Sequence, residues 1–487
     1  MNYELLIAHI ADLHYYPAAL AGGFNRAFAD DNDHLGKPAR HSERLLRATL
    51  EQLRQEPVQF ALIAGDLTHE GEYDAHVALA ELLREFQRQT GTQMLLVPGN
   101  HDINNDHAAE YTSGKKQPAR QTSIEDFWVI YRPLLPEGAR FCGSDYALEL
   151  DERHTLIALD TTKPDARVHG EITAEQLHWA LEECARASEA GRTVLGLMHH
   201  NLASHMGHIL SGYLLDNYLH VRERLARAGM KFCFCGHQHR GHVAKINCDD
   251  HVLYDVCAPA LNSFPCQFHR VALQDNNAQV TAHAADPTLP LHDSFKFTFA
   301  GRRGGLMGFF SANLQRKLPE VLEDIAQCGG AQSWLTQRGT QTPAWLRPVL
   351  AQLDARYIAK PANALKLAEK VLRRVMKLRI SPHGTLQDCF ETSLVFVYGF
   401  GDWRQDPLLR DAVQRIEDGR FVSQALRLAG EIIARDMLRT GRQSRLLLQV
   451  SLAAVFLPHR RAISRALAKL SLDMLSMPRK QEYNLKG

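Results

Sequence analysis

The sequence predicts an α/β domain followed by a mostly α-helical domain. Short apolar runs, most of them rich in Ile, Leu or Val, alternate with helical patterns over roughly the first 285 residues. From about residue 310 onward the pattern is helical almost throughout. Strands buried between helices read as apolar runs, whereas a surface helix repeats its apolar residues every three or four positions. We therefore expect a first domain at 1–285, a linker at 286–309 and a second domain at 310–487.

The elements of the first domain follow one another in βα order. Strands are expected at 3–10, 58–64, 93–97, 154–159, 193–198 and 231–235. Helices are expected between many of them, at 41–56, 73–90, 173–190 and 216–228. Shorter strands at 251–256, 267–274 and 279–284 make a more β-rich close. Chemistry in open α/β sheets lies at the carboxyl ends of the strands, so these ends are where functional side chains are expected.

The charge of the chain is divided between its two parts. The formal net charge is only +1, but residues from 301 onward hold 30 basic and 16 acidic side chains, a net +14, which leaves −13 for the first 300. Of the 25 histidines, only His383 and His459 lie in the second part. We infer that metal chemistry belongs to the first part and a basic surface to the second.

The cysteines and the N-terminus favour a cytoplasmic protein. The nine cysteines are scattered without metal-ligand spacing, and Cys233-Phe-Cys235 alternates as a strand would, with both thiols on one face. Reduced, buried thiols are therefore expected. A strand is already expected at 3–10, so no signal peptide is expected. No segment has 18 uninterrupted apolar residues, so no membrane span is expected.

Five short polar motifs each follow a strand-like run. In chain order they are Asp12-Leu-His14, Gly65-Asp66, Gly99-Asn100-His101-Asp102, His199-His200 and Gly236-His237-Gln-His239. Together they supply the Asp, Asn and His side chains that can hold two divalent ions around one shared carboxylate. Two ions held in this way activate a water molecule and clamp a phosphate, so the motifs indicate metal-assisted hydrolysis of a phosphate ester.

The seven expected ligands divide into two groups that share Asp66, because a carboxylate has two oxygens and can bridge two ions. The first group would be Asp12, His14, Asp66 and His239, and the second would be Asp66, Asn100, His199 and His237. This mixture of nitrogen and oxygen donors without a thiolate suits Mn²⁺, Fe, Zn²⁺ or Co²⁺ better than Ca²⁺ or Mg²⁺. His101 remains outside both groups, and it could donate a proton to the leaving group or hydrogen-bond the phosphate.

The ordered set of motifs resembles the calcineurin-like metallophosphoesterase superfamily, over roughly residues 1–285. The resemblance implies a β-sandwich flanked by helices, with a dimetal site above it. Within the superfamily the chain is most similar to bacterial class III cyclic-nucleotide phosphodiesterase-type members, through segments such as Ala11-Asp-Leu-His-Tyr-Tyr16 and Val97-Pro-Gly-Asn-His-Asp-Ile103. The resemblance also implies that His199, and not His200, is the ligand of its pair.

One position departs from the family pattern. Many relatives have Asp three residues after the bridging Asp66, where it orients the histidine that corresponds to His101; here the position is His69. Glu70 or Glu72 could substitute, or His101 lacks a carboxylate partner. Weaker expectations concern Asp160, which relatives often carry at a strand end, and Asn262, in a loop that relatives place near the site. Substrate contact is a minority interpretation for the polar residues that follow the second-group histidine: His200, Asn201, His205 and His208.

We expect a metal-dependent phosphoesterase, more specifically a phosphodiesterase, with a small phosphate ester as its substrate. A cyclic nucleotide is the leading substrate, by resemblance only. The alternative is a phospholipid or nucleotide-sugar diester hydrolysed at a membrane surface, and a further alternative is a non-catalytic scaffold with the same fold. The complete set of seven ligands argues against a scaffold.

A basic helix at 361–380 is the reason for the membrane alternative. Lys366, Lys370, Arg373, Arg374 and Lys377 share one of its faces. This face could contact an anionic membrane, but the simpler interpretation is a bundle helix whose Lys and Arg side chains meet water or the acidic first domain. No motif supports nucleic-acid binding.

Overall fold

The computed structural model describes residues 4–32, 39–163, 168–205, 213–263 and 265–288, and then 322–337, 354–389, 407–417 and 482–486, with scattered positions among the later ranges. The chain divides into two compact units. The first comprises 1–301, 398–400 and 477–487, and the second comprises 302–397 and 401–476. Almost all of the linker expected at 286–309 lies outside the described residues.

The helices of the first unit are α1 (Arg26–Asn32), α2 (Ser42–Gln55), α3 (Tyr73–Thr90), α4 (Ile124–Tyr131), α5 (Ala174–Glu189) and α6 (Tyr218–Arg227). Its longer strands are β1 (Leu5–Ile10), β2 (Phe60–Ala64), β3 (Gln93–Val97), β7 (Asp145–Glu149), β8 (His154–Ala158), β9 (Thr193–Leu197), β10 (Met230–Cys235), β11 (His242–Cys248), β12 (His251–Cys257), β13 (Gln267–Gln274) and β14 (Asn277–Ala284). Its shorter strands are β4 (Ala109–Glu110), β5 (Gln117–Pro118), β6 (Arg140–Cys142) and β17 (Glu482–Leu485).

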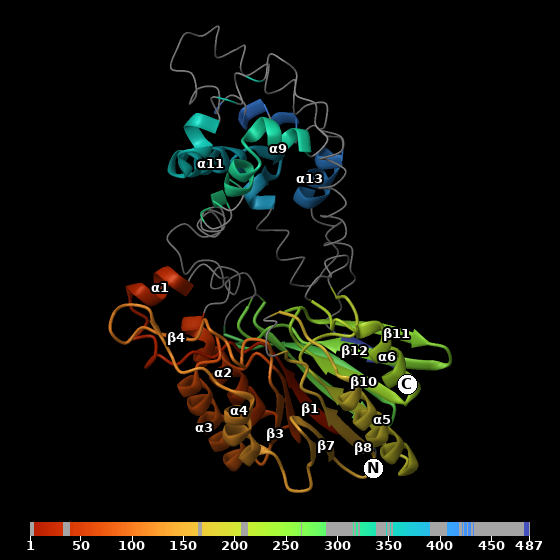
Figure 1. Cartoon of the computed structure of the whole chain (residues 1–487). Coiled ribbons are helices and arrows are strands. Elements are labelled where there is room, and N and C mark those ends of the chain that lie inside the picture. Colours follow the sequence, from red (N-terminus) through yellow and green to blue (C-terminus); the bar gives the residue numbers. More distant parts are fainter. Residues whose placement is uncertain are drawn as a thin grey trace. The chain divides into compact units, whose positions relative to one another are not determined.

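The long strands form two sheets that pack face to face as a sandwich. Sheet one has the order β17-β14-β13-β1-β2-β3, and sheet two has the order β11-β12-β10-β9-β8-β7-β6. Apolar side chains from both sheets fill the space between them, among them Leu62, Leu95, Phe232 and Phe234. The sandwich flanked by helices that the sequence resemblance implied is therefore confirmed (Figure 1).

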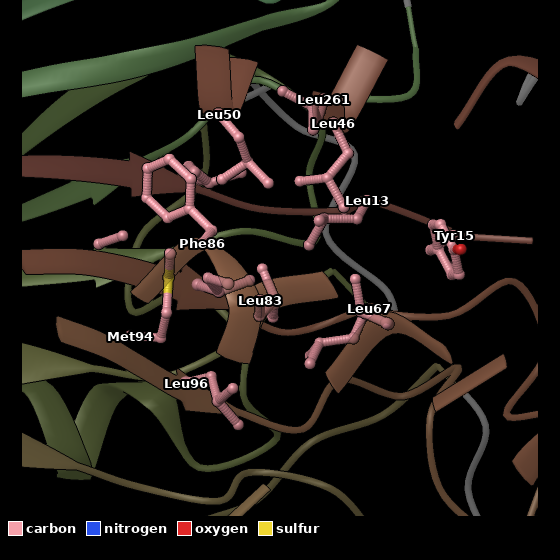
Figure 2. Close-up of a cluster of buried hydrophobic side chains, with 14 of the residues drawn as sticks. Leu13, Tyr15, Leu46, Leu50, Leu67, Leu83, Phe86, Met94, Leu96 and Leu261 are labelled. Atoms are coloured by element: carbon pink, nitrogen blue, oxygen red, sulfur yellow. The ribbon is translucent and has the colours of Figure 1, made fainter. Parts of the chain in front are cut away.

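Helices cover the outer faces of both sheets. The outer face of sheet one carries α2, α3 and α4, and the buried cluster beneath them includes Leu50, Leu83, Phe86 and Met94 (Figure 2). The outer face of sheet two carries α5 and α6. Local sequence fixes the ends of these helices: Thr173 and Gln176 form a capping box at the start of α5, and Gly91 ends α3 in the left-handed conformation.

Parallel pairing in the middle of each sheet positions the polar motifs. In sheet one, β1, β2 and β3 run parallel, and Ile10 pairs with Ile63. In sheet two, β8, β9, β10 and β12 run parallel. Because parallel strands end at the same edge of a sheet, the loops after β1, β2 and β3 meet one another, and those after β9 and β10 do the same.

Three strands of sheet two and two helices were not expected from the sequence. Strands β6, β7 and β11 occur where no strand was expected, and α1 and α4 occur where no helix was expected. Strand β7 has the pattern Asp-Tyr-Ala-Leu-Glu, in which four successive residues are buried, so it lacks both the alternation and the long apolar run of a recognisable strand. Its pairing with β8, which is non-local information, decides its conformation.

The last strand of the chain belongs to the first unit and not to the helical domain that was expected for 310–487. Strand β17 pairs antiparallel with β14, and Val280 faces Tyr483. Leu485 is buried in the cluster between the sheets, and the Tyr254 hydroxyl donates to the carbonyl of Lys486 at 2.8 Å. Four residues with no clear pattern give no sequence signal for a strand that pairs with a partner about 200 residues away.

The described part of the second unit is mainly helical. It contains α9 (Ala331–Gln337), α11 (Pro361–Met376) and α13 (Pro407–Glu417), with a π-helical turn at Asp354–Ile358 and a small hairpin of β15 (Arg379–Ser381) and β16 (Gly384–Thr385). Met376, Leu372 and Val375 of α11 pack in one apolar cluster with Leu409 and Ala412 of α13.

The basic residues of α11 are all exposed, while its apolar side packs inside its own unit. This is the arrangement of a bundle helix with a solvated basic face. No helix in the described part of the chain is long and apolar enough to cross a bilayer.

We predict that β17 stabilises the first unit. Leu485→Ala should lower the free energy of unfolding by about 2–3 kcal/mol, because it removes a buried side chain from the core of the sandwich. The matched control is Glu482→Ala on the same strand, whose exposed side chain should contribute within about 0.5 kcal/mol. Equal Tm values for the two variants in a thermal melt would contradict the prediction.

A second prediction concerns acid stability. Burial and then the neighbouring His283 lower the pKa of His269 to about 3, and burial lowers the pKa of His9 well below its usual value. Both rings are therefore neutral in the fold, but in the unfolded chain they bind protons below about pH 6.5. Stability is complete above that pH and is lost as pH falls, by about 2 kcal/mol per histidine between pH 7 and 5.

Urea unfolding of chelated protein at the two pH values measures this loss. His269→Gln should reduce it, whereas His178→Gln on the exposed side of α5 should leave it unchanged. The same loss in all three proteins would refute the assignment.

Candidate metal centre

Each expected ligand follows a strand of one sheet or the other. Asp12 and His14 follow β1, Asp66 follows β2, and Asn100 follows β3, all in sheet one. From sheet two, His199 follows β9, and His237 and His239 follow β10. Although these residues are spread over more than 220 positions of the sequence, the structure brings all seven side chains together in one place.

The backbone at this site is strained. Five of the expected ligands have positive φ angles: Asp12 (54°), His14 (41°), Asp66 (52°), His237 (67°) and His239 (56°). Among the described residues only five other non-glycine residues share this feature. The left-handed conformation costs about 1–2 kcal/mol for a residue with a side chain, and such strain gathers at functional sites.

The first group consists of Asp12, His14, Asp66 and His239, whose donor atoms all lie within 4.8 Å of one another. His239 Nε2 lies 3.2 Å from Asp12 Oδ1 and 3.5 Å from His14 Nε2. His14 Nε2 lies 3.7 Å from Asp66 Oδ2. Asp12, His14 and Asp66 are buried, and His239 is half-buried.

The second group consists of Asp66, Asn100, His199 and His237. His199 Nε2 is at its centre, 3.0 Å from Asn100 Oδ1, 3.2 Å from His237 Nδ1 and 3.4 Å from Asp66 Oδ1. The two oxygens of Asp66 therefore face different groups, Oδ2 toward His14 and Oδ1 toward His199. The carboxylate between the groups has the orientation that a bridging ligand requires.

The surroundings fit metal ions. His199 Nδ1 lies 2.8 Å from the carbonyl of Ala64, so Nδ1 carries the proton and Nε2 is left with a lone pair directed into the site. Histidines pair with both buried carboxylates: His239 with Asp12, and His14, His101 and His199 with Asp66. Imidazole and carboxylate donors are those that divalent transition metals prefer, and a bound cation would compensate the two buried carboxylates.

The motif glycines keep space open around the donors. A Cβ atom at Gly65 would lie 2.5 Å from His199 Nδ1, and one at Gly99 would lie 2.3 Å from Asp66 Oδ1. A Cβ atom at Gly236 would lie 2.9 Å from Asp12 Oδ2. Side chains at these positions would displace the donor atoms, so the glycines of the motifs are required by close approach.

Comparison with known proteins places part of this chain in a family. Residues 5–241, a little under half of the chain, match the calcineurin-like phosphoesterase family, and they form a domain of that family. Over 200 residues the chain is 30% identical to a cAMP/cGMP dual specificity phosphodiesterase of Mycobacterium tuberculosis, and the match covers 40% of this chain and 50% of that protein. The chain thus spans about half the length of the curated relative that it matches.

Solved structures of phosphatases are similar more distantly. A dimetal phosphatase from Danio rerio has 14% identity and a TM-score of 0.43, and the match covers 58% of this chain and 96% of that one. A purple acid phosphatase from yellow lupin seeds has 12% identity and a TM-score of 0.34, with coverage of 59% and 52%. At these scores the structures add nothing to the family match.

His101 of the phosphoesterase domain has a carboxylate partner after all. Its Nδ1 lies 3.2 Å from Glu70 Oε2 and 3.0 Å from the carbonyl of His69, while its Nε2 lies 3.9 Å from Asp66 Oδ2. Glu70 therefore occupies the place of the missing Asp, one of the two substitutes that the sequence suggested. The other, Glu72, accepts from the Glu70 backbone, and burial raises its pKa to about 8.

Asp102 is a supporting residue to which sequence reasoning gave no role. Its buried carboxylate accepts from the backbone N–H groups of Leu67 at 3.0 Å, Thr68 at 2.9 Å and Gly99 at 2.8 Å. It thus ties the loop of Asp66 to the loop of Asn100. Its place in the Gly-Asn-His-Asp motif, two residues after the expected ligand Asn100, was the available signal.

The remaining weaker expectations have different outcomes. Asn262 is buried next to the first motif: its side-chain amide donates to the carbonyl of His14 at 3.5 Å, and its backbone N–H donates to that of Asp12 at 3.3 Å. Asp160 accepts from the backbone and hydroxyl of Thr162, as a turn cap does. His200 is buried against Thr161, and His208 lies outside the described residues.

We predict that Asp102 maintains the shape of the domain. Asp102→Ala should lower the free energy of unfolding by about 3 kcal/mol or more, because each buried N–H that loses its acceptor costs about 1–3 kcal/mol. In the control Asp126→Ala, the lost carboxylate pairs with a largely exposed Arg120, a contribution of about 0–1 kcal/mol. Chemical denaturation of both variants measures the difference. A decrease of less than about 1 kcal/mol in the free energy of unfolding for Asp102→Ala would show that the hydrogen bonds between Asp102 and the two loops contribute little to stability.

Proposed function

We propose that the phosphoesterase domain hydrolyses a phosphate diester with the help of two divalent transition-metal ions. The observation that carries the proposal is the orientation of Asp66, whose two carboxylate oxygens face two separate groups of donors at 3.7 and 3.4 Å. Asp12, His14 and His239 would hold one ion, and Asn100, His199 and His237 would hold the other. Such ions supply Lewis acidity, which lowers the pKa of a water molecule and neutralises phosphate charge.

The side chains around Asp66 provide orientation and a proton. His101 directs Nε2 toward the site, while Nδ1 is held by Glu70 and the carbonyl of His69. A carboxylate on the far nitrogen fixes the ring and stabilises its protonated form, as general acids require. His101 would therefore donate a proton to the leaving oxygen of the ester.

A cavity beside Glu70, the carboxylate partner of His101, offers space for the leaving group of an ester. It has a volume of about 170 Å³, and its polar lining includes Asn32, His69, Glu70 and Tyr111. Since Glu70 also contacts His101, the leaving group of a substrate would lie at this cavity. A polar, sugar-like ester arm fits such a lining. Cyclic nucleotides are the first substrates to test, because the Mycobacterium tuberculosis relative is described as a cAMP/cGMP phosphodiesterase.

The alternatives from the sequence gain less support. A scaffold protein would not need seven converging donors on a strained backbone. Hydrolysis of lipid diesters at a membrane surface rested on the basic helix, whose apolar side packs within its own unit. An exposed basic face is expected both for a helix that contacts an anionic membrane and for one that contacts only water, so it does not favour the membrane alternative.

Metal and substrate dependence test the proposal together. Full-length protein should bind up to two transition-metal ions in these groups, and chelation should abolish hydrolysis of cAMP and of an aryl phosphodiester. Asp66→Asn should lower metal content and kcat/KM more than any other single ligand change, because it serves both groups. The exposed His178→Ala is the control. Undiminished turnover after exhaustive chelation would overturn the proposal.

The proton-donor role has its own test. His101→Asn should retain the metal content but lower kcat by about 100-fold or more for esters with poor leaving groups. Aryl esters, whose leaving groups need no proton, should lose much less. Glu70→Gln should show the same selectivity to a smaller degree, because it acts only through the ring of His101. Equal slowing of both ester classes would rule out proton donation.

A further inference from the structure

A second group of metal-binding side chains lies outside the centre described above. Cys233 and Cys235 are on β10, and Asp255 is on the neighbouring parallel strand β12, where it is paired in register with Cys233. The Sγ atoms of Cys233 and Cys235 are 3.5 Å apart, and Cys235 Sγ lies 3.1 Å from Asp255 Oδ1. The three donor atoms lie within 4.8 Å of one another. The Cys-Phe-Cys alternation seen in the sequence therefore places both thiols beside a carboxylate.

The group is fully buried and held from several sides. All three residues have no exposed surface. Asp255 Oδ2 accepts from the backbone N–H groups of Leu202 at 2.8 Å and Ala203 at 2.7 Å, and it lies 3.3 Å from His205 Nε2. The only ion pair of Asp255 within the described residues is with this imidazole. Among the described residues this buried carboxylate thus has hydrogen-bond donors on both oxygens but pairs with no lysine or arginine, so a cation bound beside it would compensate its charge.

The spacing agrees with that of a tetrahedral ion. Zinc–sulfur bonds of about 2.3 Å place two thiolate sulfurs about 3.8 Å apart at a tetrahedral centre, close to the observed 3.5 Å. Gly196 on β9 is the register partner of Cys233, and a Cβ atom there would lie 3.2 Å from Cys233 Sγ and 2.8 Å from Met230 Sδ. The absence of a side chain at Gly196 leaves room beside the sulfur.

We propose that Cys233, Cys235 and Asp255 bind a further divalent ion, of the zinc class. Two thiolates select Zn²⁺ over the harder cations that carboxylates and water prefer. Thiolate ligands and complete burial favour a structural site over a catalytic one, which keeps a position open for substrate. The ion would displace the two thiol protons when it binds.

The position of this site gives it a structural role. Its ligands come from β10 and β12, and the segment that follows His199 is attached to one of them through the contacts of Leu202, Ala203 and His205 with Asp255. His237 of the candidate dimetal centre follows β10, and His199 precedes the segment that holds Leu202, Ala203 and His205. A bound ion would therefore hold two strands and the loop after His199 in a fixed relation.

Cobalt substitution tests the proposal directly. Reduced, chelated full-length protein is titrated with Co²⁺, and the near-ultraviolet spectrum is recorded. Thiolate ligation gives a charge-transfer band that the nitrogen and oxygen donors of the dimetal centre cannot produce. We expect the final amplitude of this band to correspond to one thiolate-bound cobalt per chain, and the total metal content to exceed by one ion that of Cys233→Ser/Cys235→Ser. Cys184→Ser is the matched control, since Cys184 is buried in the same cluster but lies outside this donor group.

The outcomes separate this site from the dimetal centre. Asp66→Asn should keep the band even if it loses hydrolysis and the other ions. Absence of the band in the wild-type protein would overturn the proposal, whether or not the double variant folds. Persistence of the band in a folded double variant, checked by circular dichroism, would also overturn it. If the wild-type protein shows the band but does not hydrolyse phosphodiesters, the result would count against the proposed function and not against this site.

Discussion

The candidate metal centre depends on a backbone that is held against its own preference. Five of the seven expected ligands have left-handed φ angles, at a cost of about 1–2 kcal/mol for each residue. Asp and His tolerate this conformation better than most residues, which is one reason why the short motifs contain them. The remaining cost must be offset by the surroundings. Parallel strands bring the three ligand loops of sheet one to one edge of that sheet, and the two ligand loops of sheet two to one edge of the other. Asp102 and Asn262 then fix the loops by hydrogen bonds.

This dependence explains why the centre is so deeply embedded in the fold. Sheet one contributes four of the expected ligands and sheet two contributes three. The two sheets must therefore keep a fixed position relative to each other for the groups to meet at Asp66. The apolar layer between the sheets fixes that register. The glycines at 65, 99 and 236 add a second requirement, because each leaves room for a donor atom that a side chain would displace.

Sequence reasoning predicted the features that local pattern determines. The apolar runs predicted β1, β2, β3, β8, β9 and β10 to within a few residues. The ordered motifs predicted seven ligands, and their side chains lie together in the structure. It could not predict β7, whose buried residues neither alternate nor form a long run, nor β17, whose pairing partner is far away in the chain. Glu70 was only one of two substitutes for the missing aspartate, because the choice between neighbouring glutamates depends on the path of the turn after Asp66. The role of Asp102 depends on three backbone N–H groups from two loops, and its place in the Gly-Asn-His-Asp motif suggests only that it lies near Asn100, not that these groups converge on it.

The return of the chain to sheet one at β17 makes the helical unit an insertion within the phosphoesterase unit. On the ribosome, strands β1 to β14 are synthesised first, but the edge of β14 stays unpaired until residues 482–485 emerge. An open strand edge is a template for wrong pairing. The long stretch of chain between β14 and β17 must close as a loop before these two strands can pair, which delays the correct pairing. The helical unit therefore has time to fold before sheet one is complete. Its two ends are then fixed to the same enzyme domain, so removing it requires an excision and a new join between β14 and β17, not a simple truncation.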